Sequence, residues 1–374
     1  MAMAMAMAII KPRWRAAGRA AVLIGAMGLA ACTHLFVEDC PDQVLGNDTL
    51  PRMRTSRYRI QLADTAAAAA RFVAPAQMSV LAYHSGSDCK ASGESVSDVD
   101  AAALVQALGR PGVDGPGWSL APELGSPGGC EDDTGFMFQV WRRQVAGRDE
   151  LVLAFRGTGG KGDWLYGNLW WLTRWFIADN QYSRARAQAS RVIERVTAEA
   201  RANGRPDPVV RTTGHSLGGG LAQQVLYAHP TQVLQAIVFD PSSVTGFVDV
   251  PKAAQREACA CRDELGSEAR ILRVYESYEV LALLRSFHKA FLPPERHVQE
   301  LRFPFASTWN LVAQHSIQAF TKQLQAAAAP ASAAASKAPW YASADARCTA
   351  RLQTGQQQSC RAAVGADAFN VCPR

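Results

Sequence analysis

The stretch RTTGHSLGGGLAQ, residues 211–223, flanks Ser216 with Gly214 on one side and with Gly218 to Gly220 on the other. Glycine weakens both helices and strands, so four glycines around one serine indicate a backbone too crowded for side chains. A β-rich run precedes the stretch and a helical pattern follows it. Together they match the G-x-S-x-G turn, in which a serine between a strand and a helix projects its hydroxyl above a sheet.

Short apolar runs alternate with helical stretches around this turn, which predicts an α/β fold with a mostly parallel central sheet and helices on both faces. The predicted strands are FMFQVW (136–141), LVLAF (151–155), PVVRTT (208–213), QAIVF (235–239), RILRVY (270–275) and VQELRF (298–303). Helices are predicted over residues 181–204, with Asn180 as the cap, and over residues 217–229.

Two motifs carry a resemblance to a known family. TGHSLGGGLA (213–222), preceded by LVLAFRGT (151–158), resembles the class 3 (fungal-type) lipases of the α/β-hydrolase superfamily, and the likeness covers roughly residues 136–320. The resemblance implies an α/β-hydrolase fold. It also implies hydrolysis of acylglycerol or phospholipid esters by a Ser/acid/His triad, with no metal and no cofactor.

The base of such a triad must follow Ser216, because the superfamily order along the chain is serine, acid, histidine. A serine hydroxyl needs this base to become a nucleophile. His315 follows the last predicted strand and precedes a final helix, where the superfamily has its base. His288 and His297 are alternatives, whereas His229 lies at the far end of the helix that Ser216 begins.

The acid departs from the family pattern. After the strand RILRVY the family commonly has an aspartate followed by apolar residues, and this chain has Glu279 there. Glutamate can also orient an imidazole, so Glu279 is the predicted acid. Asp240, directly after the strand QAIVF, is the alternative, since some hydrolases of this fold carry the acid one strand earlier. Glu276 is the third candidate.

The negative charge that develops on a substrate carbonyl oxygen needs hydrogen-bond donors. One predicted donor is the main-chain N–H of Leu217, the residue after the nucleophile. The resemblance implies that the second comes from Thr158, which closes the FRGT motif.

A tryptophan-rich segment, GDWLYGNLWWLTRWFIADN (162–180), follows that motif, and it is apolar nearly all round. Such a helix is either buried or in contact with lipid, and aromatic rings suit a membrane interface. The family often has a lid here, so a lid is expected, with a core helix as the alternative. The tryptophans concerned are Trp164, Trp170, Trp171 and Trp175.

The N-terminus has the pattern of a secretory signal, in which four basic residues precede an apolar run that is too short to span a bilayer. It ends in LAAC, which resembles the lipobox of bacterial lipoproteins. That resemblance implies a signal peptide over residues 1–31, a lipid on Cys32 and a membrane anchor in the cell envelope. By the same resemblance, Thr33 in place of an aspartate after the cysteine favours the outer membrane. The alternative is an ordinary signal, with Cys32 in a disulfide.

The rest of the chain divides by composition. Residues 32–60 are predicted to form a tether, 61–325 the lipase-like domain, 326–339 an Ala/Pro/Ser linker and 340–374 a Cys-containing tail. An even number of cysteines beside Cys32 suggests up to four disulfides: Cys40, Cys89, Cys130, Cys259, Cys261, Cys348, Cys360 and Cys372. Their spacing does not match a zinc site.

Charge argues against nucleic acid as a partner. The net charge of +6 falls to +2 without the four basic residues of the signal peptide, and no basic stripe is apparent. The expected function is that of an exported, lipid-anchored serine hydrolase acting on lipid-like acyl esters. The alternatives are a small-ester carboxylesterase and a non-catalytic envelope lipoprotein that binds lipid.

Overall fold

The computed structural model divides the chain into two compact units, Met1–Val37 and Glu38–Arg374. It describes residues of the second unit only: 58–59, 65–84, 96–111, 115–127, 130, 132, 135–157, 175–242, 245–265, 270–276, 298–303, 305 and 315–328. For residues 175–180 it describes the helical backbone alone.

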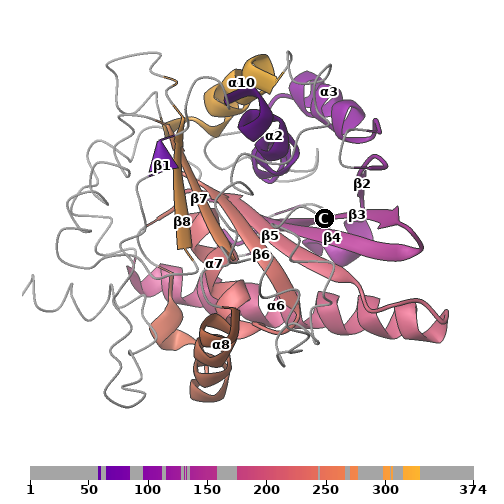
Figure 1. Ribbon diagram of the computed structural model, residues 1–374, viewed down its shortest axis with the longest axis vertical. Coiled ribbons are helices and arrows are strands. Elements are labelled where there is room, and N and C mark those ends of the chain that lie inside the picture. The colour runs from indigo at the N-terminus through magenta and orange to yellow at the C-terminus, as the bar shows by residue number, and fades with distance from the viewer. Residues whose placement is uncertain are drawn as a thin grey trace, which may run out of the picture. The chain divides into compact units, whose positions relative to one another are not determined.

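An eight-stranded sheet forms the centre of this unit, in the order β1-β8-β7-β6-β5-β4-β3-β2 (Figure 1). Neighbouring strands from β4 through β8 to β1 are parallel, whereas β2, β3 and β4 pair antiparallel. The described part of the chain is therefore an α/β fold with a mostly parallel sheet. The strands are β1 Tyr58–Arg59, β2 Ser119–Leu120, β3 Phe138–Val145, β4 Arg148–Phe155, β5 Val209–His215, β6 Val233–Phe239, β7 Ile271–Glu276 and β8 Val298–Phe303.

Helices cover both faces of the sheet. One face carries α2 (Thr65–Leu81), α3 (Asp98–Leu108) and α10 (Ile317–Ala328), and the other carries α6 (Trp175–Ala202), α7 (Leu217–Ala228) and α8 (Lys252–Leu265) (Figure 1). Short 3-10 turns lie at Pro122–Leu124 and Phe247–Asp249. No described helix has both the length and the apolar character needed to cross a bilayer.

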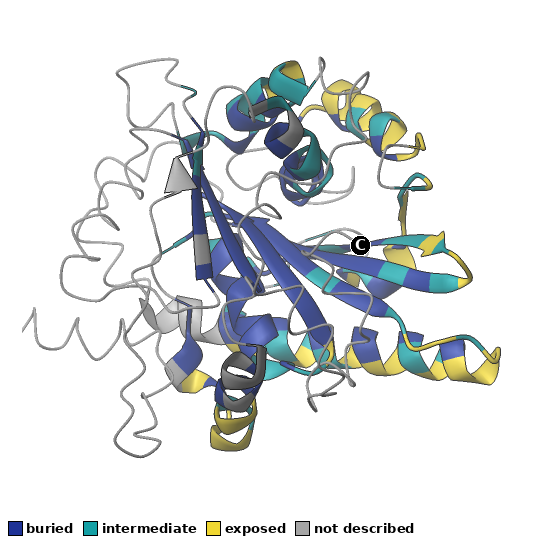
Figure 2. Cartoon of the chain, in the orientation of Figure 1, coloured by how far each residue is buried: buried dark blue, intermediate teal, exposed yellow. Residues whose placement is uncertain are grey.

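The sheet separates two hydrophobic cores because successive strand residues point to opposite faces. In β4, Leu151, Leu153 and Phe155 pack in the core beneath α6 and α7, while Val152 and Ala154 pack in the core beneath α2 and α10. The central strands are buried over almost their whole length (Figure 2). This double burial explains why they are continuous apolar runs in the sequence.

The predicted strands are all present, and so is the helix after Ser216. The cap predicted at Asn180 is wrong, because α6 already begins at Trp175. The last helix, α10, runs to Ala328, so it extends into the segment predicted as a linker over residues 326–339.

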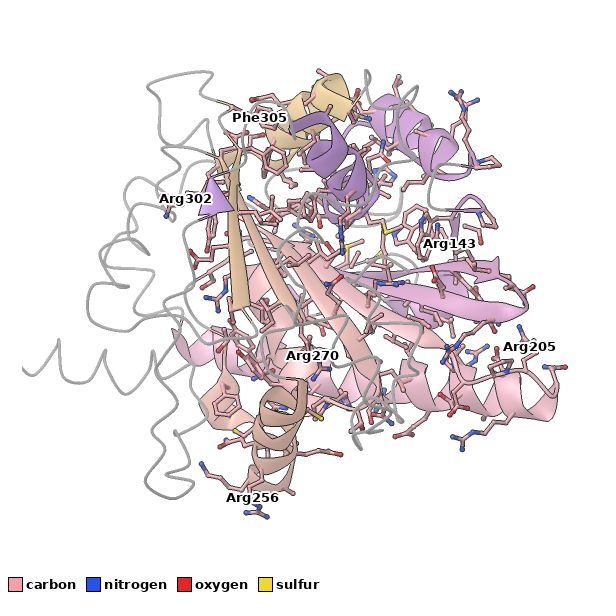
Figure 3. All side chains as sticks on the ribbon, viewed as in Figure 1. Arg143, Arg205, Arg256, Arg270, Arg302 and Phe305 are labelled. Carbon is pink, nitrogen blue, oxygen red and sulfur yellow. The ribbon has the colours of Figure 1, made fainter. Side chains whose placement is uncertain are left out.

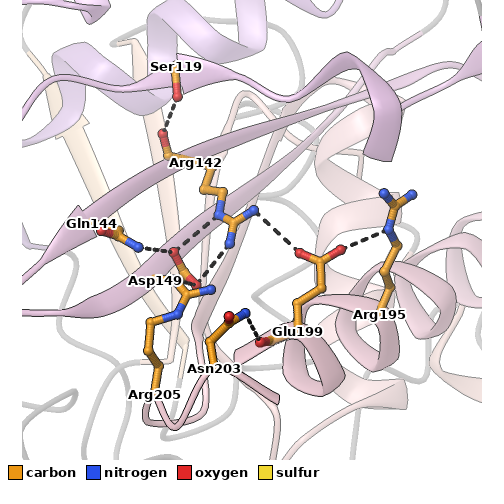
Figure 4. Close-up of polar contacts among 8 residues, drawn as sticks. All are labelled: Ser119, Arg142, Gln144, Asp149, Arg195, Glu199, Asn203 and Arg205. Carbon is orange, nitrogen blue, oxygen red and sulfur yellow. Dashed lines mark hydrogen bonds and ion pairs between the residues drawn. The ribbon is translucent and has the colours of Figure 1, made fainter. Parts of the chain in front are cut away.

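A buried ionic cluster lies at the amino end of β4. The carboxyl end of this strand, which pairs with β5 near Ser216, is the opposite end. Asp149 is fully buried and accepts hydrogen bonds from Arg142 (3.1 and 3.0 Å), Arg205 (2.6 Å) and Gln144 (3.3 Å) (Figure 4). Burial is the largest influence on the pKa of Asp149 and raises it, but Arg142, Gln144 and Arg205 together hold the pKa below its usual value. Because Arg205 follows the end of α6 (Figure 3), the cluster joins that end to the β3–β4 hairpin.

Candidate active site

Ser216 stands at the junction of β5 and α7, at the carboxyl end of a central parallel strand. Its backbone has φ 56° and ψ −124°, a conformation that residues other than glycine rarely adopt. Its N–H donates to the carbonyl of Phe239 (3.1 Å), and its own carbonyl accepts from the N–H of Ser242 (2.9 Å). The end of β6 and the turn after it therefore hold this strained conformation in place.

The glycines around Ser216 are required by close backbone packing. A methyl group at Gly218 would overlap the main-chain oxygen of Phe155, and one at Gly214 would overlap that of Gly218. One at Gly219 would lie 2.7 Å from Cβ of Pro241. The backbone crowding that the sequence predicts is confirmed, and it brings the first turn of α7 against the ends of β4 and β6.

His315 meets Ser216 across 99 residues of sequence. The distance from Ser216 Oγ to His315 Nε2 is 3.0 Å, and the contact is partly buried. His315 lies directly before α10, where the Ser316 hydroxyl accepts from the N–H of Ala319 (3.4 Å) in the first turn. A neutral imidazole with its proton on Nδ1 could accept the serine proton at Nε2 in this geometry.

The two described candidates for the acid lie at the carboxyl ends of β6, which is next to β5, and of β7, the strand after it in the sheet. Asp240 follows β6, is fully buried, has φ 37°, and accepts a hydrogen bond from the N–H of Glu276 (3.4 Å). Glu276 ends β7, and its Oε1 accepts from Nε2 of Gln323 on α10 (3.4 Å). Glu279 lies outside the described residues, so the identity of the acid stays a prediction.

Leu217 is the first residue of α7. Its N–H therefore belongs to a first turn whose N–H groups find no acceptor within the helix. Of the other predicted site residues, Thr158, Cys32, Trp164, Trp170 and Trp171 lie outside the described part of the chain. Trp175 is described only as the backbone start of α6.

The sequence reasoning missed two side chains behind this contact. His215 precedes Ser216, and its Nδ1 lies 2.9 Å from the hydroxyl of Tyr83. Its ring also lies against that of His315, with centroids 4.6 Å apart and planes inclined by 42°. The position of His215 inside the quoted motif could have drawn attention to it, whereas nothing in the sequence marks Tyr83.

Burial keeps the His215 ring neutral. Burial is the main reason that the pKa of His215 lies well below its ordinary value, and the charge of His315 lowers that pKa further. The main chain of His315 acts in the opposite direction and raises it.

No family model matches the chain, and no curated protein matches it in sequence. Within the described ranges, no group of three or more His, Cys, Asp or Glu side chains is placed to hold a metal ion. Cys130, Cys259 and Cys261 are disulfide-bonded. The full pairing, like export of the chain, stays a prediction.

Proposed function

We propose that this protein is a serine ester hydrolase with an α/β-hydrolase fold, acting on lipid-like acyl esters through an acyl-enzyme on Ser216. The observation that carries the proposal is the 3.0 Å contact between Ser216 Oγ and His315 Nε2, made on a strained turn at the carboxyl end of a parallel strand. This is where open α/β sheets bind their ligands.

In the proposed reaction, Oγ of Ser216 attacks the carbonyl carbon of the ester while its proton passes to Nε2 of His315. The N–H groups at the start of α7, with that of Leu217 first, would stabilise the charge on the carbonyl oxygen. The intermediate collapses, the alcohol leaves with the proton from His315, and the acyl group stays on Ser216. Water then attacks this ester, His315 takes its proton and returns it to Ser216, and the carboxylic acid departs.

The proposal includes a cellular site. A lipid on Cys32 would hold the domain at a membrane of the bacterial cell envelope, most simply the outer membrane. The predicted tether over residues 32–60 is too long by its last residues, because Tyr58–Arg59 form β1 of the sheet, so the proposed tether is the part before β1. A second acyl chain gives stable anchoring where a single chain is marginal. Lipid esters would then be within reach of the domain.

A fluorophosphonate probe tests the chemistry, because it reacts with serines that a neighbouring base activates. A soluble form that begins after Cys32 should label, and its Ser216→Ala variant should not. Hydrolysis of p-nitrophenyl esters of increasing acyl length would then separate a lipase from a small-ester carboxylesterase. Absence of labelling in the folded wild-type protein would refute the proposal and favour a non-catalytic lipid-binding role.

A further inference from the structure

The hydrogen bond between Tyr83 and His215 has no part in the proposed reaction. Both side chains are buried, each with 2% of its surface exposed, and Tyr83 follows α2 while His215 ends β5. The pair also packs against Gly157, in the loop after β4. A methyl group at Gly157 would overlap the hydroxyl of Tyr83 and lie 2.5 Å from the main-chain oxygen of His215.

Tyr83 lies opposite His215 because residues four apart near the end of α2 have nearly the same spacing as residues two apart on β5. Ser79 Oγ lies 3.0 Å from Thr213 Oγ1, and the Tyr83 hydroxyl lies 2.9 Å from His215 Nδ1. Four residues of a helix rise about 6 Å, and two residues of a strand span about 6.6 Å. The two hydrogen bonds are therefore successive contacts that α2 and the turn after it make with β5. Nε2 of Gln139 also donates to the carbonyl of Leu81 (2.9 Å), which holds the end of α2.

The neutral His215 ring carries one N–H, and its neighbours select the nitrogen. Nδ1 faces the Tyr83 hydroxyl, which can donate to it. Nε2 is buried and makes no hydrogen bond of ordinary geometry within the described part of the chain. The main chain of His315 nevertheless favours a proton on the ring. A proton on Nε2, with the Tyr83 hydroxyl donating to Nδ1, satisfies both contacts, whereas a proton on Nδ1 would leave the main chain of His315 facing a nitrogen without one.

We propose that His215, oriented by Tyr83, is a positioning residue for His315. With its proton on Nε2, the His215 ring supports the His315 ring and main chain from behind. His315 Nε2 then stays within hydrogen-bond distance of Ser216. The inference rests on the proposed function, because it assigns a role to His215 in placing the base of that reaction.

Tyr83→Phe tests the inference, since it removes only the hydroxyl that fixes the His215 tautomer. Ser79→Ala is the matched control, because it removes the hydroxyl of the neighbouring contact between α2 and β5. With a soluble p-nitrophenyl ester, Tyr83→Phe should lower kcat about fivefold with KM unchanged, the effect of one neutral hydrogen bond. Ser79→Ala should keep the wild-type kcat and KM.

A second measurement does not depend on activity. In the Ser216→Ala protein, imidazole ¹⁵N NMR should show His215 as the neutral Nε2–H tautomer at about pH 7, and Tyr83→Phe in that background should mix the two tautomers. A proton on Nδ1 of His215, or equal loss of kcat in Tyr83→Phe and Ser79→Ala, would overturn the inference. If the wild-type protein neither labels nor hydrolyses esters, the proposed function fails, and the NMR result still decides the tautomer.

Discussion

Gly218→Ala is the sharpest test of the packing that holds Ser216. The added methyl group would overlap the main-chain oxygen of Phe155 and lie 2.8 Å from the carbonyl carbon of Arg156. Ordinary contacts of a Cβ atom begin at 3.4 Å, so Arg156 must retreat by 0.6 Å (3.4 − 2.8). These are backbone atoms at the end of a central strand, and no flexible side chain can absorb the shift.

The expected cost follows from two opposing terms. Overpacking of this kind costs about 1–3 kcal/mol, and the better helix propensity of alanine offsets about 1 kcal/mol of it. The difference is a net loss of up to about 2 kcal/mol, which should lower the melting temperature by up to about 8 °C in a domain of this size. The displaced β4 loop also alters the site around Ser216, and misplacement by 1 Å can cost about 100-fold in rate. We expect fluorophosphonate labelling to slow at least about tenfold.

Gly109→Ala is the matched control. Gly109 caps α3 with φ −70°, and a methyl group there would meet nothing closer than the Val105 oxygen at 3.5 Å. This substitution should stabilise the domain by about 0.4–1 kcal/mol, because it restricts the unfolded chain. Thermal unfolding by circular dichroism and the rate of labelling measure both variants. Equal melting temperatures and equal labelling rates in Gly218→Ala and Gly109→Ala would refute the packing argument.

Three further predictions follow from other sites. Asp149→Asn removes the carboxylate shared by two arginines and should lower the free energy of unfolding by about 3 kcal/mol in urea titration. Asp207→Asn, at an exposed ion pair, should change this free energy little. Equal losses in the two variants would contradict the stabilising role of the buried cluster. Burial lowers the pKa of His229, so below about pH 6.5 the unfolded chain gains a proton that the folded chain does not, and stability falls as the pH falls. His229→Gln should therefore reduce the slope of stability against pH just below about pH 6.5, by at most about 1.4 kcal/mol per unit, and an unchanged slope would count against it. If the Thr158 hydroxyl binds the oxyanion, Thr158→Val should lower kcat about 10²- to 10³-fold, and wild-type kcat would remove Thr158 from the site.

The central strands could be predicted because burial on both faces makes each one an apolar run bounded by polar residues. The helix α2 could not. Pro75 lies inside it, and proline removes a helical hydrogen bond, so the sequence favours a break there. The helix continues through Pro75 because it packs on β5 and α10. Tertiary packing here overrides local propensity.

In the same way, Ser216 could be found from the sequence and Tyr83 could not. Ser216 has an unusual backbone conformation, which requires glycines nearby, and those glycines form a pattern that can be found in the sequence. Tyr83 follows α2 and meets His215 across 132 residues. No local constraint restricts the residues around Tyr83, so no motif forms there. Its contact arises from the register of α2 on β5, which depends on all the side chains between them and is visible only once the helix is placed on the sheet.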